Sequence, residues 1–438
     1  MKGQKRMIST YDEARSWIHG RLQFGIKPGL ERMSWMLEKL GSPHKHLKAM
    51  HIAGTNGKGS TLSYLREMLC AGGYTVGTFT SPYIETFNER ISVNGKPIRD
   101  EELVHLVNEV KDVVESLNET NFGEATEFEV ITVMAFYYFG KVNKQDFVIF
   151  ETGLGGRLDS TNVVNPIATI ITNIGFDHMN ILGNTIEEIA GEKAGIIKKN
   201  IPLFTAVEQK GALDVIQQKA KVEHAPVYVL ERDFCTSSLE AEELSERFQF
   251  SGFDIVLSNV KLSMLGAHQV KNAALALAAL LYLKQAGLLN IEVNKIYEGL
   301  KRTAWLGRFE QISQNPLIFL DGAHNIQGIE SLVSTVKRHY KEYNVHVVFS
   351  CLKDKEAIEL VTRLEEIATS IIFTTFDFPR ADNPEHVAAV SQHSSKVIEM
   401  DFKKAIEKGK QNLTKEKDLL LITGSLYFIS EVRNYLLS

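Results

Sequence analysis

The sequence predicts an α/β protein of two domains: a larger domain (residues 1–300) with a mainly parallel sheet, and a smaller, Rossmann-like α/β domain (residues 301–438). Three observations predict this architecture. Short apolar runs alternate with amphipathic helical segments over most of the 438 residues, a glycine-rich turn follows the first run, and the alternation restarts after "KRTAWLGRFE" (301–310). A chain of this length also exceeds what one compact core accommodates. We place the hinge between the domains at residues 301–308.

The bulk composition excludes several classes of protein. The 49 basic and 54 acidic residues give a net charge of −5 without a long run of one sign, which argues against a surface for nucleic acid or an anionic membrane. Three cysteines far apart in the chain (Cys70, Cys235 and Cys351) predict neither a disulfide framework nor a cysteine zinc site. No apolar stretch approaches the roughly 18 residues of a membrane span. We expect a soluble, uncleaved protein of the reducing cytoplasm.

The elements of the larger domain follow from the spacing of apolar residues. Helical spacing dominates the first 45 residues, with a break at "FGIKPG" (24–29). A βαβ unit follows, with its glycine-rich turn at the carboxyl end of its first strand, where open α/β sheets bind ligands. The expected elements are strands at 51–54, 74–80, 146–153 and 166–175, helices at 60–73, 129–140 and 272–287, and an antiparallel insertion at 251–263. The segment "CTSSLEAEELSER" (235–247) is interpreted as only a polar surface segment.

The smaller domain repeats the alternation of strands and helices over about 130 residues, a usual domain size. Its strands are expected at 316–325, 345–351, 370–376, 395–400 and 418–425.

The segment "HIAGTNGKGS" (51–60) is a candidate phosphate-binding loop. Its glycines allow backbone N–H groups to approach phosphate oxygens, and the following helix presents its positive N-terminal end. The segment departs from the G-x-x-x-x-G-K-[ST] pattern because Gly59, and not a hydroxyl residue, follows Lys58. The alternative is an ordinary strand-to-helix turn. The order of strand, turn, lysine and helix favours phosphate binding.

Two later strands also end in polar side chains. Glu151 ends a strongly apolar strand, so its carboxylate becomes a candidate Mg²⁺ ligand if that strand neighbours the phosphate loop. The alternative is a carboxylate that caps a turn. Asp177 and His178 follow the next strand, and a lone histidine is more often structural than catalytic.

The helix after His178 places a lysine on its apolar face. Thr185 and Glu188 form a capping box, and Lys193 follows Ile189 by four residues. Such a lysine usually extends to solvent. Burial would instead lower its pKa and leave a neutral amine, which can react with CO₂ to form a carbamate, an oxygen ligand for a cation.

In the smaller domain, "FLDGAHN" (319–325) places Asp321, His324 and Asn325 at a strand end, again where α/β sheets bind ligands. An ordinary loop of turn-forming residues is an equally good reading of this segment alone.

Ten segments in order resemble the folylpolyglutamate synthase family, which includes bifunctional dihydrofolate synthase/folylpolyglutamate synthases and is related to the muramyl peptide ligases. The resemblance covers nearly the whole chain and shows no departure at these motifs. The segments are "FGIKPGLERM", "HIAGTNGKGS", "FTSPYIETFNERISVNG", "TEFEVIT", "ETGLGGRLDSTN", "FDHMNILG", "GEKAGIIK", "NAALAL", "GRFE" and "LDGAHN". The implied fold is a Mur-ligase-like, P-loop-containing ATPase domain followed by a smaller α/β domain.

The resemblance also implies roles for individual residues. The implied ATP-binding residues are Asn56, Gly57, Lys58, Gly59, Ser60, Asn272, Arg308 and Asp321. The implied Mg²⁺ ligands are Ser81, Glu151, His178 and Lys193 as a carbamate. Lys58, Lys193 and His324, which lies beside the γ-phosphate path, are the implied catalytic residues. The implied pterin-binding residues are Thr126, Glu127, Phe128, Glu129, Leu158, Asp159 and Ser160.

The implied reaction is an ATP-dependent ligation of L-glutamate to a folate, and to dihydropteroate as well, through an acyl phosphate. Its cofactors would be ATP and two Mg²⁺ ions, its other partners only small molecules, and its state a monomer. From the residues themselves, the chain is interpreted as a Mg²⁺/ATP enzyme that acts across two α/β domains. A muramyl-type ligase is disfavoured because only about 50 residues, less than a domain, precede the phosphate loop. A nucleotide-switch ATPase is the alternative from another class.

Overall fold

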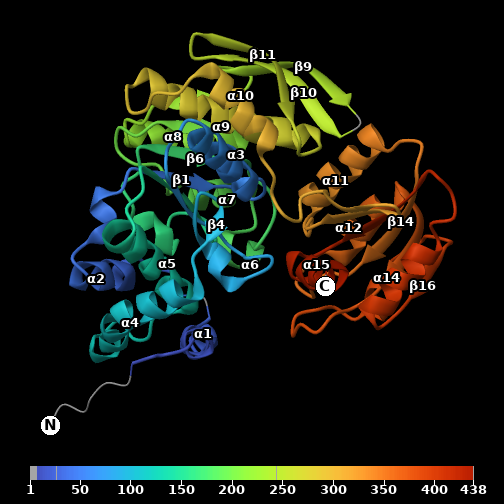
Figure 1. Ribbon diagram of the computed structural model, residues 1–438, viewed down its shortest axis with the longest axis horizontal. Coiled ribbons are helices and arrows are strands. Elements are labelled where there is room, and N and C mark those ends of the chain that lie inside the picture. Colours follow the sequence, from blue (N-terminus) through green and yellow to red (C-terminus); the bar gives the residue numbers. More distant parts are fainter. Residues whose placement is uncertain (1–6, 26, 243, 438) are drawn as a thin grey trace.

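Three β-sheets organise the protein, which we describe from a computed structural model over residues 7–25, 27–242 and 244–437. The large domain lies to the left in Figure 1, the C-terminal domain lies to the right, and a small antiparallel sheet lies above them. Residues 1–6 of the predicted larger domain, residue 26 of the predicted break and residue 243 of the predicted polar segment lie outside the described residues.

The sheet of the large domain has eight strands in the order β4-β3-β2-β5-β1-β6-β7-β8. All neighbouring strands from β2 to β8 run parallel, whereas β3 and β4 form an antiparallel edge that the sequence analysis did not predict. The strands are β1 (Ala49–Ala53), β2 (Val76–Phe79), β3 (Ile91–Val93), β4 (Lys96–Pro97), β5 (Phe147–Glu151), β6 (Ala168–Ile171), β7 (Leu203–Thr205) and β8 (Val227–Val229). The carboxyl ends of β2, β5, β1 and β6 therefore meet at one edge of the sheet.

Helices cover both faces of this sheet, which explains why its strands are apolar on both sides. Successive residues of β5 point to opposite faces of the sheet and join different hydrophobic clusters. Ile149 belongs to the cluster that contains α3 and α9, whereas Val148 and Phe150 belong to the cluster that contains α1, α2, α4 and α5. The helices are α1 (Tyr11–His19), α2 (Glu31–Lys39), α3 (Lys58–Ala71), α4 (Asp100–Ser116), α5 (Glu127–Tyr137), α6 (Met179–Leu182), α7 (Ile186–Ala194), α8 (Lys210–Val222), α9 (Ala267–Gln285) and α10 (Val293–Arg302).

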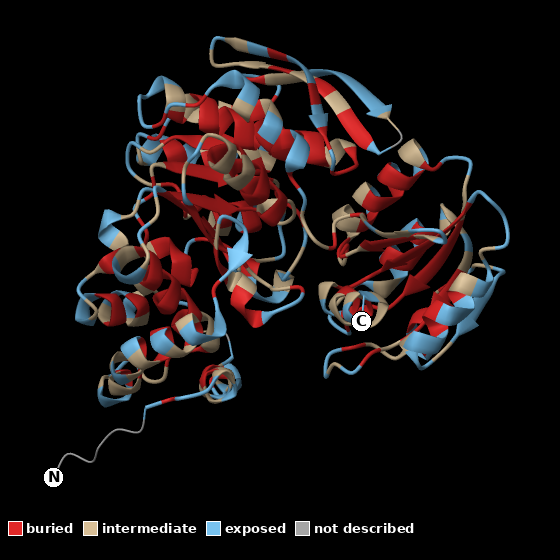
Figure 2. Cartoon of the chain, viewed as in Figure 1, coloured by how far each residue is buried: buried red, intermediate tan, exposed pale blue. Residues whose placement is uncertain are grey.

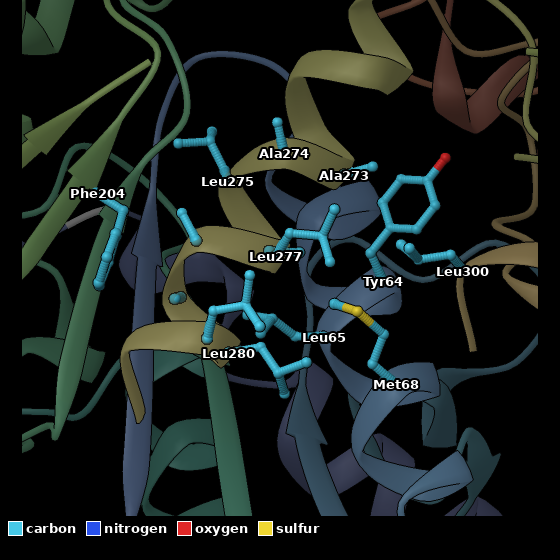
Figure 3. Close-up of a cluster of buried hydrophobic side chains, with 14 of the residues drawn as sticks. Tyr64, Leu65, Met68, Phe204, Ala273, Ala274, Leu275, Leu277, Leu280 and Leu300 are labelled. Atoms are coloured by element: carbon cyan, nitrogen blue, oxygen red, sulfur yellow. The ribbon is translucent and has the colours of Figure 1, made fainter. Parts of the chain in front are cut away.

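The centre of the large domain is the contact between α3 and α9. Helix α9 is apolar on nearly all sides and is buried accordingly, and its alanines allow neighbouring elements to approach closely. Figure 3 shows Leu65 and Met68 of α3 beside Leu277 and Leu280 of α9. Because α3 begins directly after the glycine-rich turn, this packing holds the turn at the edge of the sheet.

The small antiparallel sheet has the order β11-β10-β9. Its strands are β9 (Cys235–Glu242), β10 (Ser245–Gly252) and β11 (Ile255–Leu262). The predicted insertion at 251–263 is thus the β10–β11 hairpin. The interpretation of 235–247 as only polar surface is wrong, because this stretch forms β9 and the start of β10 and buries Ser245 and Glu246. Most side chains of β9 are polar and exposed, so the strand lacks the alternation of apolar and polar residues from which strands are predicted.

The C-terminal domain contains a six-stranded sheet in the order β12-β13-β17-β14-β15-β16. Its five predicted strands are present and run parallel; β12, which pairs antiparallel to β13, and helices α13 and α15 were not predicted. The strands are β12 (Glu310–Gln314), β13 (Leu317–Asp321), β14 (Asn344–Phe349), β15 (Ala368–Phe373), β16 (Lys396–Ile398) and β17 (Asp418–Thr423). The helices are α11 (Ile326–His339), α12 (Ala357–Glu365), α13 (Pro384–Ala389), α14 (Phe402–Gln411) and α15 (Leu426–Leu437).

A short link at 303–309 joins the two sheets. Buried residues, coloured red in Figure 2, form separate interiors on either side of this link. The expected boundary between residues 300 and 301 lies in the last turn of α10, and the division at that point stays a prediction. Over the described residues, no helix has both the length and the apolar character needed to cross a membrane.

Candidate active site

The glycine-rich turn lies between β1 and α3 and is held by the neighbouring strand. The Thr172 hydroxyl donates to the Asn56 carbonyl oxygen (2.6 Å), and the Asn56 amide donates to the Asn173 side-chain oxygen (2.9 Å). Gly57 has a φ of 82°, and a Cβ atom there would clash with the side-chain oxygen of Asn272 from α9. Only glycine combines this left-handed conformation with such a close approach. The turn is therefore a rigid cradle at the N-terminus of α3.

Two lysines converge on one carbonyl oxygen of this turn. The Lys58 Nζ donates to the Gly54 carbonyl oxygen (3.0 Å) and to that of Thr55 (3.2 Å). The Lys193 Nζ donates to the same Gly54 oxygen (3.1 Å). Lys193 is 4% exposed, which confirms its predicted inward position on α7. Burial, and then the positive charge of Lys58, lower the pKa of Lys193 to about 7. An amine that loses its proton near neutral pH therefore lies beside the candidate phosphate loop.

The residues after Lys58 pack against other parts of the protein. Ser60 is 1% exposed, and its hydroxyl oxygen lies 3.4 Å from the side-chain nitrogen of Gln269. A Cβ atom at position 59 would lie 2.7 Å from the indole nitrogen of Trp305, which belongs to the link between the sheets. Gly59 thus allows the interdomain link to pass close to the turn.

Glu151 lies beside the turn, as the sequence predicts if their strands are neighbours. Strand β5 pairs with β1 and places Glu151 opposite Ile52. The Ser81 amide, just beyond β2, donates to the Glu151 carboxylate (3.2 Å). Burial raises the pKa of Glu151, while the positive charge of Lys58 opposes that rise. The carboxylate and the Ser81 residue therefore meet at the edge where β1, β5 and β2 end.

The donors at this edge fit a hard cation. Mg²⁺ prefers oxygen ligands and is usually held by one or two carboxylates together with substrate phosphates and water. Within residues 7–25, 27–242 and 244–437, no three His, Cys, Asp or Glu side chains gather as a complete metal site. Glu151 and Ser81 can accordingly supply only part of a coordination shell, and phosphate oxygens would complete it.

Asp177 connects the large domain to the C-terminal domain. Its carboxylate lies 2.5 Å from the Lys355 Nζ and accepts a hydrogen bond from the Asn325 side-chain nitrogen (3.0 Å). The His324 Nε2 lies 3.5 Å from the same carboxylate. Burial alone would raise the pKa of Asp177, but the hydrogen bond and charge of His324 and the charge of Lys355 hold it well below its usual range. His178 has a 41% exposed side chain and a left-handed backbone.

Lys355 was not predicted, although it follows the carboxyl end of β14 as the other site residues follow theirs. Asn325 also contacts the turn directly, since the two amide side chains of Asn325 and Asn56 exchange hydrogen bonds of 3.0 and 3.1 Å. The C-terminal domain is thus docked on the turn itself.

Asp321 and Arg308 lie on the C-terminal side. The Asp321 carboxylate accepts hydrogen bonds from the amides of Phe309 and Ala323, both of 2.8 Å. Burial raises the pKa of Asp321 and lowers that of Arg308, and the two opposite charges partly offset these effects. The carbonyl of Gly322 accepts a hydrogen bond from the His324 Nδ1 (2.9 Å), which orients that ring.

A cavity of about 960 Å³ between the domains collects the predicted nucleotide, metal and catalytic residues. This volume is at the upper end of the range for small-molecule sites. Its walls include Asn56, Gly57, Lys58, Gly59, Ser60, Ser81, Glu151, His178, Lys193, Asn272, Arg308, Asp321 and His324.

The seven predicted pterin-binding residues do not line this cavity. Thr126 and Glu129 form the capping box of α5, and Glu129 also pairs with Arg32 at 2.7 Å. Glu127 lies 3.1 Å from His19, and Phe128 packs against Gly153, which does line the cavity. Leu158, Asp159 and Ser160 precede or begin a short 3-10 turn near Gly153. The two segments flank the cavity, and their role stays a prediction.

A buried network that the sequence analysis missed links the turn to the segment at 158–160. The His51 Nε2, on β1, lies 2.8 Å from the Thr161 hydroxyl, which donates to the Asp159 carboxylate (2.5 Å). Asp159 in turn accepts from the amide of Leu154 (2.8 Å), a residue of the cavity wall. Burial lowers the pKa of His51 to about 3, so its ring is neutral. The sequence signal that could have indicated this network is His51 itself, a polar residue inside an otherwise apolar strand.

Comparisons with known proteins agree over both domains. Two family models match: the Mur ligase middle domain over residues 52–280 and the Mur ligase glutamate ligase domain over residues 307–426. The chain is 50% identical over 430 residues to a dihydrofolate synthase/folylpolyglutamate synthase of Bacillus subtilis (strain 168), with 98% of this chain and 100% of the relative covered.

Solved structures agree with these matches. A folylpolyglutamate synthase of Thermotoga maritima aligns with a TM-score of 0.84 at 35% identity and covers 98% of this chain and 97% of its own. An FPGS–AMPPCP–folate complex aligns with a TM-score of 0.86 at 31% identity, with 98% and 100% covered. The similarity therefore extends well beyond the phosphate loop and includes the arrangement of the two domains.

Proposed function

Because this chain belongs to the Mur ligase family, and within it to the dihydrofolate synthase/folylpolyglutamate synthase enzymes, we propose that it is an ATP-dependent ligase that adds L-glutamate to folates. The observation that carries the proposal is the interdomain cavity, where Lys58 and Lys193 meet on one side and Asp321 and His324 lie on the other. Such an arrangement suits a reaction that needs ATP and two further substrates in a closed space.

The chemistry explains why these side chains are needed. An oxygen of the folate carboxylate attacks the γ-phosphorus of ATP, the bond to the β,γ-bridging oxygen breaks, and ADP leaves. The amine nitrogen of glutamate then attacks the acyl carbon of the acyl phosphate, loses a proton, and inorganic phosphate leaves. The first step gathers negative charge, which Lys58 and the helix N-terminus behind it stabilise. The second step needs an unprotonated amine and little water.

Both domains would bind the nucleotide in this proposal. Gly57, Gly59, Ser60, Asn56 and Asn272 would hold ATP from the large domain. Arg308 and Asp321 would do so from the C-terminal side, so that closure assembles the site. His324, oriented by the Gly322 carbonyl, would lie beside the γ-phosphate.

We also propose that Mg²⁺ ions, two in number, bind at the edge where Glu151 and Ser81 meet. Glu151, Ser81, His178 and a carbamate on Lys193 would be the protein ligands. Bound there, Mg²⁺ would neutralise charge on the phosphates. The buried Glu151 carboxylate, and the Lys193 amine whose pKa is lowered to about 7, lie beside the phosphate loop and support this assignment.

The remaining parts of the proposal concern the folate and the cell. The segments at 126–129 and 158–160 would bind the pterin, and the first of them contacts the cavity wall where Phe128 packs against Gly153. Dihydropteroate would be a second acceptor. The protein would act as a monomer in the cytoplasm, without nucleic-acid or membrane partners.

ADP release tests the function directly. We expect ADP to form at a substantial rate only when ATP, a folate and glutamate are all present, measured by coupled assay with each substrate omitted in turn. Running dihydropteroate beside a folate in the same assay shows which acceptors are used. Equal ADP formation without glutamate would contradict the ligase proposal and indicate a nucleotide-switch ATPase.

The metal assignment makes a separate prediction about two serines. Ser81→Ala should weaken Mg²⁺-dependent turnover about tenfold or more, because it removes a ligand hydroxyl. Ser60→Ala should have a smaller effect, since that hydroxyl is buried toward Gln269. The measurement is the Mg²⁺ concentration giving half-maximal ATP turnover in each variant. A larger effect of Ser60→Ala than of Ser81→Ala would contradict this assignment and would indicate that the Ser60 hydroxyl, near Lys58, is the metal ligand.

A further inference from the structure

The antiparallel sheet β9–β11 contacts the C-terminal domain through Glu242 and Glu246, which do not line the cavity. In Figure 1 this sheet lies above both domains, and its strands reach the C-terminal end of α11. The contact centres on Glu246 of β10, whose side chain is 0% exposed. An ionised carboxylate so deeply buried must be paired and hydrogen-bonded.

Glu246 joins two helices that belong to different domains. Its Oε1 accepts a hydrogen bond from the Gly266 amide (2.9 Å), where α9 begins, and lies 2.7 Å from the His339 Nε2, where α11 ends. Its Oε2 lies 3.2 Å from the Arg338 guanidinium. Burial alone would raise the pKa of Glu246, but the hydrogen bond from His339 and that from Gly266 hold it below its ordinary value. The carboxylate is therefore charged.

The contacts of His339 require both ring nitrogens to donate. Its Nδ1 lies 3.0 Å from the Glu242 carbonyl oxygen, and its Nε2 faces the Glu246 carboxylate. Both partners are acceptors, so a neutral ring could satisfy only one of them. The imidazolium satisfies both, and its charge also suits the negative end of α11. The side chain of His339 is 0% exposed, so this contact has no water to replace a lost bond.

The two joined helices carry opposite walls of the cavity. Asn272 lies six residues beyond Gly266 on α9, against the phosphate loop. Helix α11 begins just after His324 and Asn325 and has 14 residues, so His339 lies about 20 Å along the helix from them. A rotation at the Glu246 end would therefore move His324 and Asn325 relative to the loop while the anchor stays in place.

We propose that Glu246 and His339 form the fixed pivot on which the C-terminal domain closes over the nucleotide. They are positioning residues, since neither lines the cavity. Other polar contacts between the domains would part on opening, and each of these pairs includes a residue of the cavity wall: Asp177 with Lys355, Asn56 with Asn325, and, at α15, Arg433 with Glu85 and Ser430 with Ile84. The proposal rests on the ligase function for its kinetic consequences but not for its geometry.

The geometric test measures the distance between the domains. Val222→Cys on α8 and Ile358→Cys on α12 replace exposed residues and can carry spin labels in the full chain lacking its native cysteines. We expect a narrow distance distribution with AMPPCP bound, which broadens at least twofold in His339→Gln and in Glu246→Gln. Lys337→Gln, which breaks only an exposed pair with Glu366 inside the C-terminal domain, should leave the distribution unchanged.

The kinetic test separates positioning from mere destabilisation. His339→Gln should raise the KM for ATP about tenfold, because the cavity walls formed by α9 and α11 would no longer be held in one relative position. A purely structural role would lower the amount of active enzyme, and with it kcat, at an unchanged KM. The double variant Glu246→Leu with His339→Leu removes both fully buried groups together and leaves only Arg338, whose side chain is 27% exposed, without its carboxylate partner. It should fold while keeping the broadened distribution and the raised KM.

The result that would overturn the pivot is a distance distribution and a KM for ATP equal to those of the unchanged protein in all three variants. NMR of histidine-labelled protein gives a further check, with both nitrogens of His339 expected to carry protons; an unprotonated nitrogen on that ring would also contradict the proposal. The distance measurement needs no folate or glutamate. Its outcome is therefore independent of whether the ligase function is correct.

Discussion

Lys58→Met is expected to lower the rate of ATP-dependent ligation about a thousandfold. Methionine keeps the length and apolar stem of lysine, so α3 should begin as before. The variant loses the ammonium group that the carbonyls of Gly54 and Thr55 hold at the mouth of the turn. That charge is placed where the transferred phosphoryl group would gather negative charge, so its loss should affect the transition state more than the binding of ATP.

The measurement compares kcat with the dissociation constant of AMPPCP. We expect kcat to fall about a thousandfold while the dissociation constant rises about tenfold at most. Lys210→Met is the matched control, because Lys210 is likewise the first residue of a helix but is exposed and does not line the cavity. A Lys58→Met variant that retains a tenth or more of the original rate would contradict the role assigned to this lysine.

Lys193→Ala is expected to abolish ligation, with partial rescue by formate or acetate. The expected loss is about a thousandfold or more, since a carbamate ligand and its charge would both disappear. A short carboxylate can enter the space left by the side chain and supply an oxygen ligand. The burial of Lys193 beside Lys58 motivates this expectation, because it leaves a neutral amine that can take up CO₂. Lys199→Ala, at an exposed position six residues later, is the control.

The pH dependence follows from the same residue. The folded-state pKa of Lys193 is lowered to about 7, so the neutral amine declines as the pH falls below 7, and carbamate formation should decline with it. An unfolded lysine titrates near 10.4, so between pH 7 and about 10 the unfolded chain binds more protons. Stability should therefore rise with pH across that window, and Lys193→Met should remove this rise.

Two observations would contradict the carbamate. The first is a mass spectrum, recorded under mild conditions in CO₂, that shows only unmodified Lys193. The second is a lack of rescue by any short carboxylate in a Lys193→Ala variant that folds normally. Normal folding is checked by an unchanged circular dichroism spectrum.

Local patterns accounted for most elements and for the candidate site residues at strand ends. The parallel strands β1, β5 and β6 follow from their apolar runs, and parallel strands bring their carboxyl ends to one edge. Glu151 was therefore expected beside the turn on the condition that its strand neighbours β1, whereas Asp177 was expected only at the end of another strand. Lys193 could be placed on the inner face of α7 because helical periodicity is set by the backbone alone.

Two of the missed elements, strands β9 and β12, are stabilised by partners rather than by their own patterns. Strand β9 is largely polar and exists because it pairs with β10; β12 pairs with β13 at the edge of the second sheet. Glu246 reads as one more surface glutamate, yet it is buried because α9 and α11 supply its donors. A short sequence window contains none of these partners.

The amino-acid sequence alone was sufficient for the α/β class, the glycine-rich strand-to-helix turn that carries Lys58, and the inward position of Lys193, since each depends on contacts within one strand, turn or helix. Phosphate binding at that turn stays a prediction. The tertiary structure decided which domain faces meet: that Asp177 pairs with Lys355, that Asn325 docks on Asn56, and that the predicted pterin segments flank the cavity instead of lining it. These pairings join residues more than a hundred positions apart. They depend on how the two domains pack against each other in three dimensions. The periodicity of a short sequence segment contains no information on that packing.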